Sequence, residues 1–230
     1  MYQDKKISLI IPCFDEEQGI SQILRDVPLL IDEVIVIDNG SKDQTAQVAE
    51  RLGARVIFES RRGYGRAYLT GFAAAMGDII VTMDGDNSYP ITAVPVLVTH
   101  MIDRELDFIS GCRFPLEQKD SMPLLNRIGN RLLTLCFNLT AATWLRDSQS
   151  GMWVFRREIL KGISLVHPGM CFSEEIKMEV ILSGKHRFVE FPIPYNERLG
   201  RAKLRRWRDG AQNLLFLFQK RLSIALRRRG

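Results

Sequence analysis

Along the first half of the chain, short apolar runs alternate with segments in which apolar residues recur every three or four positions. The apolar runs cover residues 7–13, 33–38, 55–59, 78–83 and 106–111. The segments with helical spacing cover residues 16–26, 43–52, 67–76 and 91–103. Continuous apolar strands separated by helices are typical of a parallel sheet that is buried on both faces. The pattern therefore predicts an α/β fold with a mostly parallel central sheet and helices on both faces.

Polar clusters directly follow four of the predicted strands. They read Phe14-Asp15-Glu16, Asp38-Asn39-Gly40-Ser41, Arg61-Arg62-Gly63-Tyr64-Gly65 and Asp84-Gly85-Asp86. In open α/β sheets, ligands bind in the crevice beyond the carboxyl ends of the strands. Because these ends share one edge of a parallel sheet, the four clusters predict a single ligand site.

The pair Asp84 and Asp86 is the candidate metal site. Alternate residues of an extended chain point the same way, and Gly85 between them permits a tight turn. A hard divalent cation held by only one or two carboxylates keeps coordination positions for the phosphates of a substrate. Asp-Gly-Asp is also ordinary turn chemistry, so the pair alone leaves both interpretations open. The other polar clusters at the same edge favour the metal.

Residues 122–145 do not continue the alternation of short strands and helices. The segment has no acidic residue and places its apolar side chains with helical spacing. Its polar stripe consists of Arg127, Asn130, Arg131, Thr134 and Asn138. A helix with so broad an apolar face is ordinarily buried in a core. Two arginines one turn apart without a nearby acid favour a helix at a membrane interface, and the sequence leaves both interpretations open.

The charge of the chain is divided unevenly. The 230 residues carry a net charge of +5, whereas residues 201–230 hold ten Lys or Arg and one acid, Asp209, which leaves residues 1–200 with −4. In this tail, Trp207 and the apolar block 214–218 stand beside clustered basic residues, as in a helix that lies in the headgroup region of an anionic membrane. A basic helix that docks on the body is the alternative. RNA binding is disfavoured because the aromatic residues are not interleaved with the basic ones.

Length and composition bound the organisation of the protein. We expect one large domain at residues 1–204, followed by a basic amphipathic membrane-interface segment at 205–230. No apolar stretch approaches the roughly 18 residues that span a bilayer, and the N-terminus shows no signal-peptide pattern. The four cysteines are scattered, which is typical of reduced cytosolic thiols and predicts neither a disulfide framework nor a zinc site.

Seven short motifs stand in a fixed order along residues 7–204. They are Ile11-Pro12-Cys13-Phe14-Asp15-Glu16, Asp38-Asn39-Gly40-Ser41-Lys42-Asp43-Gln44-Thr45, Gly63-Tyr64-Gly65-Arg66-Ala67, Asp84-Gly85-Asp86, Gly111-Cys112-Arg113, Asp147-Ser148-Gln149-Ser150-Gly151 and Arg198-Leu199-Gly200-Arg201-Ala202-Lys203-Leu204. Together they resemble the motifs of the family-2 glycosyltransferases of the GT-A fold, specifically the polyprenyl-phosphate group that includes dolichol-phosphate mannose synthase. The resemblance implies a Rossmann-like GT-A sheet, to which the amphipathic interfacial helices are added.

The resemblance also implies a role for each matching residue. The nucleotide site would contain Pro12, Phe14, Glu16, Asp38, Arg62, Gly63, Asp84, Arg198 and Lys203. Asp84 and Asp86 would hold Mg²⁺ or Mn²⁺ against the diphosphate, and the acceptor phosphate would be received by Arg113, Arg127 and Arg131. The candidate catalytic residues are Asp86, Asp147 and Glu175, with Asp147 as a base or an acceptor-orienting group. Helix capping is the alternative role for Asp147, and simple solvation is the alternative for Arg198 and Lys203.

The activity implied is the inverting transfer of a hexose from a GDP- or UDP-linked sugar to a polyprenyl or dolichyl monophosphate. The enzyme would be peripheral, on the cytoplasmic face of a membrane. Its expected partners are the nucleotide-sugar, the polyprenyl phosphate, an anionic membrane surface and a membrane-spanning partner subunit, with no nucleic acid.

Three departures from the family pattern concern the fine contacts with the nucleotide. Asp15 and Asn39 exchange acid and amide relative to the usual motifs, and Ala202 replaces a serine. The alternatives are a transferase for another lipid or glycan hydroxyl, or a non-catalytic subunit that binds a nucleotide-sugar and tethers a complex to the membrane.

Overall fold

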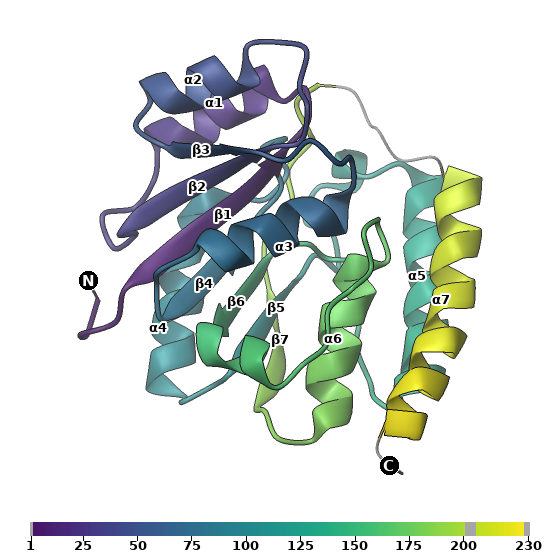
Figure 1. The fold of residues 1–230 in the computed structure, drawn as a ribbon. Helices are drawn as coiled ribbons and strands as arrows, with labels where there is room; N and C mark the ends of the chain where they lie inside the picture. The colour runs from purple at the N-terminus through teal and green to yellow at the C-terminus, as the bar shows by residue number, and fades with distance from the viewer. Residues whose placement is uncertain (1, 201–205, 228–230) are drawn as a thin grey trace.

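The strand β1 (Ile7–Cys13) lies within the central sheet, between β2 and β4 (Figure 1). The computed structural model describes residues 2–200 and 206–227, and within them seven strands form one sheet in the order β3-β2-β1-β4-β6-β5-β7. The other strands are β2 (Glu33–Asp38), β3 (Arg55–Phe58), β4 (Ile79–Thr82), β5 (Phe108–Cys112), β6 (Trp153–Arg156) and β7 (Phe188–Pro192). Only β6 runs antiparallel to its described neighbours, β4 and β5, which confirms the mostly parallel sheet.

Successive side chains of β1 enter two different cores, one on each face of the sheet. Ile7, Leu9 and Ile11 are buried beneath α1 (Glu17–Arg25), α2 (Thr45–Arg51) and α4 (Val94–Asp103). Ile10 is buried in the second core, beneath α3 (Tyr64–Ala74) and α6 (Phe172–Ser183). The alternation follows from the two-residue repeat of an extended chain, and it confirms the prediction of helices on both faces.

Two further helices, α5 (Leu124–Ala141) and α7 (Arg206–Arg227), pack against each other and against α6 (Figure 1). Their inner faces share a third core with α6. It contains Phe137, Ala141, Leu145, Met178, Leu182, Leu217 and Ile224. The sequence set residues 205–230 apart from the catalytic domain, whereas in the structure α7 packs on the body.

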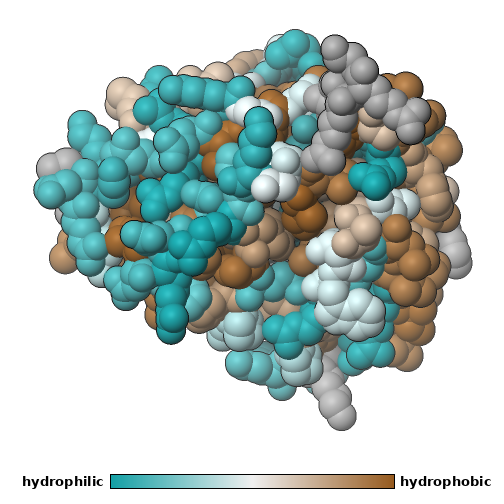
Figure 2. Space-filling model, turned by 90° about the horizontal axis from the view of Figure 1, so that it is seen from below, coloured by the Kyte–Doolittle hydropathy of each residue, from teal (hydrophilic) through white to brown (hydrophobic). Residues whose placement is uncertain are grey.

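The outer sides of α5 and α7 expose large apolar side chains, and Figure 2 shows apolar residues gathered on this side of the molecule. They are Leu124, Leu125, Ile128, Leu132, Leu135 and Leu139 of α5 and Leu214, Leu215, Phe218, Leu222 and Leu226 of α7. We call this set the apolar helix face. Contiguous apolar surfaces of this kind mark membrane or protein binding sites. Within the described residues, no helix is both long enough and apolar enough to cross a bilayer.

The elements between residues 148 and 200 were not assigned from the sequence, and they complete the sheet and its second face. They are β6, α6 and β7, with a 3₁₀ turn at Arg157–Lys161. Two more 3₁₀ turns, Ile91–Ala93 and Lys119–Ser121, precede α4 and α5. The helix α3 begins at Tyr64, three residues before the predicted start, so that the Gly-rich motif forms its first turn.

Candidate active site

The two aspartates of the candidate metal site lie directly after β4, at the carboxyl end of the strand. The hydroxyl of Tyr64 donates a hydrogen bond of 3.1 Å to Oδ1 of Asp84. Oδ1 of Asp86 accepts hydrogen bonds from the N–H and the hydroxyl of Ser88, at 3.0 and 2.5 Å. A Cβ atom on Gly85 would lie 2.5 Å from the sulfur of Cys13. The turn between the aspartates therefore requires glycine.

The charge of this pair is only partly compensated by the protein. Burial and, second, the negative charge of Asp86 raise the pKa of Asp84 to about 7, because a carboxylate is poorly stabilised away from water and beside another anion. Arg198 pairs with Asp86, with its Nη2 3.2 Å from Oδ2, and the charges of Arg113 and Arg198 both act to lower the pKa of Asp84. Within the described residues there is no cluster of three or more metal-binding side chains. Two carboxylates fit a hard divalent cation that takes its remaining oxygen ligands from water and phosphate.

Arg198 bridges the aspartate pair and the first polar cluster. Its Nη2 also lies 3.3 Å from Oε1 of Glu16, and the next residue, Leu199, donates its N–H to the carbonyl of Asp86 at 2.8 Å. Nε of Arg198 is shielded from solvent and has no acceptor among the described residues. The loop therefore brings an unused donor to the aspartates, where a diphosphate would need one. Lys203, predicted to act with Arg198, lies outside the described residues.

A second group of predicted residues meets at the ends of β1 and β2. The guanidinium carbon of Arg62 lies 3.9 Å from the centre of the Phe14 ring, and Nη2 of Arg62 donates to the carbonyl of Gly40 at 3.0 Å. Asp38 is buried, and its Oδ1 accepts the N–H of Ser41 at 2.9 Å. Pro12 is half-buried in β1 beside them. Aromatic, guanidinium and carboxylate groups in one place suit a nucleoside, which offers a ring face and polar edges.

Asn39 ties the second polar cluster to the third. Its amide nitrogen donates to the carbonyls of Glu59 and Arg61 at 2.9 and 3.0 Å. Its amide oxygen accepts the N–H of Gly63 at 2.8 Å. An aspartate, the residue usual in the family pattern, could not donate to the two carbonyls. The amide is therefore matched to this loop, and it accounts for one of the departures in sequence.

Replacement of Asn39 by aspartate is expected to loosen this loop and to weaken the binding of a nucleoside diphosphate. The Glu59 carbonyl, in a buried contact, and the Arg61 carbonyl, in a partly buried one, lose their donor. Each unsatisfied buried group costs about 1–3 kcal/mol, so we expect Tm to fall by several degrees, at about 2–4 °C per kcal/mol. Thermal unfolding and calorimetric titration measure both effects. The matched control is Asn126→Asp, at a half-buried α5 side chain without a hydrogen bond among the described residues. An unchanged Tm and affinity would contradict the assignment.

Contacts within the protein explain why the Gly-rich motif has glycine at positions 63 and 65. A Cβ atom on Gly63 would lie 2.2 Å from the carbonyl oxygen of Pro168, and one on Gly65 would lie 2.0 Å from that of His167. The sequence interpretation placed Gly63 in the nucleotide site. In the structure both glycines make room for the loop before α6, whereas a contact of Gly63 with the nucleotide stays a prediction.

Asp147 and Arg113 form a buried ion pair. Both oxygens of Asp147 accept from the guanidinium, at 2.7 and 2.8 Å, and one also accepts the N–H of Arg113 at 3.0 Å. Burial raises the pKa of Asp147, but the charge and hydrogen bonds of Arg113 outweigh it, so the pKa lies below its usual range. The Arg113 guanidinium stacks 5.2 Å from the Tyr195 ring. These contacts suit a residue that orients Arg113 better than a general base.

Glu175, the weaker catalytic candidate, is engaged elsewhere. One oxygen accepts the N–H groups of Val166 and His167, at 3.0 and 2.8 Å, and the other pairs with Lys220 of α7 at 2.8 Å. Lys220 also pairs with Glu179 at 2.7 Å. These contacts support a structural role, because they hold α7 on the body. They also remove Lys220 from the charges that the sequence assigned to a membrane.

The other two candidate acceptor residues lie on α5. Arg127 is half-buried, and its Nε is shielded from solvent without an acceptor among the described residues. Arg131, one turn further along the helix, is exposed. Arg127 thus offers a donor for an anion, while Arg131 is free to reach one at the surface.

Gly151 packs against the Tyr64 hydroxyl and the Asp84 carboxylate, a role that its motif alone did not indicate. Its N–H donates to the Tyr89 hydroxyl at 2.7 Å, and its carbonyl accepts from Thr82 at 2.9 Å. A Cβ atom here would lie 2.4 Å from the Tyr64 hydroxyl and 3.2 Å from Oδ1 of Asp84. Sequence reasoning assigned no function to these hydroxyls, because nothing in the spacing relates Tyr64 or Tyr89 to residue 151.

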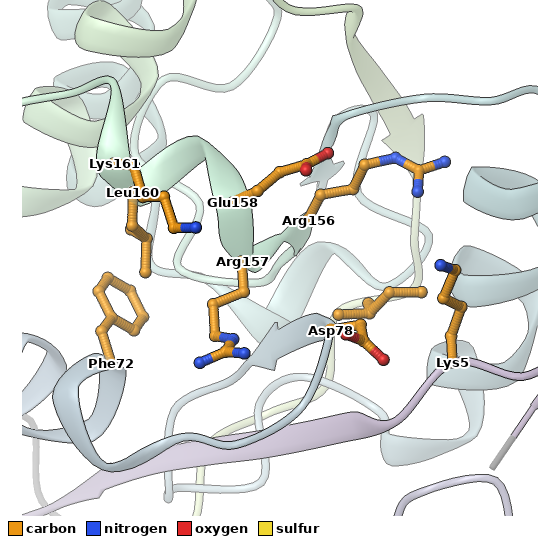
Figure 3. A pocket seen from close by; sticks show the side chains of 9 residues that line it. Lys5, Phe72, Asp78, Arg156, Arg157, Glu158, Leu160 and Lys161 are labelled. Carbon is orange, nitrogen blue, oxygen red and sulfur yellow. The ribbon is translucent and has the colours of Figure 1, made fainter.

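A cavity of about 530 Å³ lies away from all of these residues (Figure 3). It is lined by the start of β4, the end of β6 and the 3₁₀ turn that follows, at the opposite edge of the sheet from Asp84. Its charged groups Lys5, Asp78, Arg157, Glu158 and Lys161 are exposed and Arg156 is half-buried, and in Figure 3 they do not converge on one point. The candidate site is therefore the cluster at the carboxyl ends of the strands.

Comparisons with known proteins identify relatives of this chain. The sequence model of the family described as Glycosyl transferase family 2 matches residues 8–164. A dolichyl-phosphate hexose transferase of Haloferax volcanii is 32% identical over 213 residues, 91% of each chain. A low-salt glycan biosynthesis hexosyltransferase of the same organism is also 32% identical, over 92% of this chain and 52% of its own.

The fold is shared with solved structures. One is glucosyl-3-phosphoglycerate synthase of Mycobacterium tuberculosis, solved in complex with Mn²⁺, uridine diphosphate and phosphoglyceric acid. It superimposes with a TM-score of 0.76 at 24% identity, covering 95% of this chain and 79% of that one. The sheet order and the helices on both faces are therefore a known glycosyltransferase architecture.

Proposed function

The chain belongs to glycosyl transferase family 2, and on this premise we propose that it transfers a hexose from a nucleotide-sugar to a polyprenyl monophosphate, with inversion at the anomeric carbon. The observation that carries the proposal is that one short segment, residues 147–151, contacts two groups of residues suited to phosphate, through Asp147 at one end and Gly151 at the other. Asp84 and Asp86 with Arg198 suit a nucleoside diphosphate. Arg113, near enough for its charge to lower the pKa of Asp84, suits the phosphate of an acceptor.

The residues of the chain divide the work of the transfer between them. Phe14, Arg62 and Asp38 hold the nucleoside, and Asp84 and Asp86 hold Mg²⁺ or Mn²⁺, which when bound supplies positive charge to the diphosphate. An oxygen of the acceptor phosphate attacks the anomeric carbon while the nucleoside diphosphate leaves from the opposite face. Arg198 donates to the leaving group as its charge grows, which is where a preorganised cation lowers the barrier.

The acceptor needs no strong base. A phosphate monoester loses its second proton near pH 6, so its oxygen is already a nucleophile at neutral pH. This fits the engagement of both Asp147 oxygens by Arg113. Asp147 therefore acts in our proposal by holding the Arg113 guanidinium, which receives the acceptor phosphate. Arg127 offers its unused Nε to the same phosphate.

The apolar helix face supports a membrane-bound acceptor. A polyprenyl chain stays in the bilayer, so an enzyme that acts on its phosphate must work at the surface. We propose that α5 and α7 lie on the cytoplasmic leaflet as a peripheral contact, with Arg127 and Arg131 at the level of the headgroups. A membrane-spanning partner subunit that covers the same face is the alternative that the vesicle experiment below distinguishes.

The proposed function is tested with the purified full-length chain, vesicles that contain a polyprenyl monophosphate, a panel of UDP- and GDP-sugars, and Mg²⁺ or Mn²⁺. We expect a polyprenyl-phosphate sugar, detected by mass spectrometry, from one or a few of the donors. Transfer only to a glycan or lipid hydroxyl would replace the acceptor in this proposal. Binding of a nucleotide-sugar without transfer to any acceptor would favour the non-catalytic subunit.

Replacement of Arg127 by alanine is expected to raise the KM for polyprenyl phosphate about tenfold or more, since one charge-assisted hydrogen bond contributes about 1.5–3 kcal/mol. Affinity for the nucleoside diphosphate should stay unchanged, and Arg131→Ala should show a smaller effect. The matched control is Arg104→Ala, at the exposed residue directly after α4. Equal weakening of both substrates would show that Arg127 is structural.

A further inference from the structure

The segment of residues 146–151 contacts both Arg113 and Asp84. It has no regular secondary structure, yet it carries Asp147, which holds Arg113, and Gly151, which abuts Asp84. A shift of its backbone would therefore move the guanidinium proposed to bind the acceptor.

The ammonium group of Lys177, on α6, binds the carbonyl side of this segment. Its Nζ donates to the backbone oxygens of Asp147, Ser148 and Ser150, at 3.3, 2.7 and 2.9 Å. Lys177 is 0% exposed. A lysine ammonium has three donors and no acceptor, so each of its N–H bonds has a partner in one short stretch of backbone.

The N–H side of the segment is bound as well. The carboxylate of Glu190, on β7, accepts the N–H groups of Arg146 and Asp147 at 2.7 and 2.8 Å. The Thr134 hydroxyl of α5 accepts the N–H of Ser148 at 3.1 Å. A loop held by a cation on its carbonyls and an anion on its N–H groups has its position set by polar contacts.

Packing alone does not explain a lysine at this position. Burial of an ammonium is unfavourable unless the group is paired and hydrogen-bonded, and an apolar side chain of similar length would fill the space at lower cost. From these contacts we propose that Lys177 is a positioning residue for the transfer, which fixes the 147–150 backbone and thereby the guanidinium of Arg113. The inference rests on the proposed acceptor and adds a residue that does not touch either substrate.

A pH dependence follows from the same group. Burial lowers the pKa of Lys177 to about 8, opposed by the charges of Asp147, Glu190 and Glu174 and assisted by that of Arg113. Lys177 is therefore mostly protonated below pH 8 and loses its third proton as the pH rises through that value. A neutral amine has only two N–H bonds and cannot donate to three carbonyls. We expect the KM for the acceptor to rise above about pH 8.

Unfolding would not account for this rise. Because the pKa of Lys177 is lower in the folded chain than its ordinary value of 10.5, the unfolded chain binds more protons between pH 8 and 10.5. The contribution of this group to stability therefore increases with pH over that range. Loss of function with a retained fold is the expected combination.

The test compares Lys177→Met with the wild type in full-length protein. Lys185→Met, at an exposed residue just after α6, is the matched control. We expect kcat/KM for polyprenyl phosphate to fall roughly 10- to 100-fold, as for other residues that orient a binding group. The Kd for UDP or GDP with Mn²⁺ should change by less than about twofold, and the rise in KM above pH 8 should disappear. Equal loss for both substrates, or a pH profile like that of the wild type, would overturn the inference.

Two further measurements keep the test decisive. If Lys177→Met does not fold, Glu190→Gln removes the anion that binds the N–H groups of the segment. This variant should raise the KM for the acceptor and leave the Kd for UDP or GDP nearly unchanged. Hydrogen exchange of residues 146–151 should accelerate in either variant, and it requires no turnover. If the wild type transfers nothing to polyprenyl phosphate, the proposed function fails, whereas unchanged exchange in the variants rejects the role of Lys177.

Discussion

Replacement of Asp86 by asparagine is expected to lower kcat by more than about 100-fold, which corresponds to at least about 3 kcal/mol of transition-state stabilisation. The carboxylate carries one of the two negative charges available to a divalent cation, and its Oδ2 pairs with Arg198 at 3.2 Å. Asparagine keeps the shape and the hydrogen bonds to Ser88 but removes the charge. Addition of EDTA to the wild type should produce a comparable loss.

The measurement needs a readout besides turnover. Calorimetric titration of Mn²⁺ in the presence of UDP or GDP should show that Asp86→Asn binds the cation far more weakly, while Tm stays within a few degrees. The matched control is Asp103→Asn, at an exposed carboxylate that ends α4, which should change neither. Full turnover in EDTA, or an unimpaired Asp84→Ala/Asp86→Ala double variant, would refute the metal site.

Exchange of Leu132 and Phe218 for glutamate is expected to reduce vesicle binding by more than about 100-fold, because each buried Leu or Phe side chain contributes about 1.5–3 kcal/mol. One residue lies on α5 and the other on α7, with exposed fractions of 57% and 58%, so the fold should be retained. Turnover with the lipid acceptor should fall in parallel, and nucleotide binding should not.

Flotation with vesicles measures this effect. Electrostatic attraction is screened over about 8–10 Å at physiological salt, whereas insertion of apolar side chains is not. The wild type should therefore bind anionic vesicles strongly, neutral ones more weakly, and should be only partly released by salt. The control pair is Leu29→Glu and Phe58→Glu, at side chains that are 103% and 66% exposed outside the apolar helix face. A wild type that stays in solution with anionic vesicles at low salt would assign the face to a partner subunit.

The first half of the fold could be predicted because its information is local. The apolar runs at residues 7–13 and 33–38 coincide with β1 and β2, since a fully buried parallel strand is apolar along its length. The first three residues of β6 are apolar as well, but an apolar run does not indicate the direction of its strand. The antiparallel direction of β6 is set by pairing with β4 and β5, whose positions depend on segments far away in the sequence.

The residues of the candidate site also differ in how far the sequence alone could place them. Asp84, Asp86, Phe14, Asp38 and Arg62 could be placed at one edge because each lies at the end of a predicted strand or within a few residues after it. Arg198 could be named from its motif but not placed, since the loop that carries it reaches Asp86 through long-range backbone contacts.

By itself the sequence determined the parallel part of the sheet, the edge that carries the candidate site, the family and the apolar character of two helices. Only the tertiary structure decided which charges meet: Asp147 with Arg113, Glu175 with Lys220, and Lys177 with three backbone carbonyls. The physical reason is that periodicity and composition report whether a side chain prefers water. The partner of a buried charge is chosen by elements that come together only on folding, and burial then makes that partner obligatory.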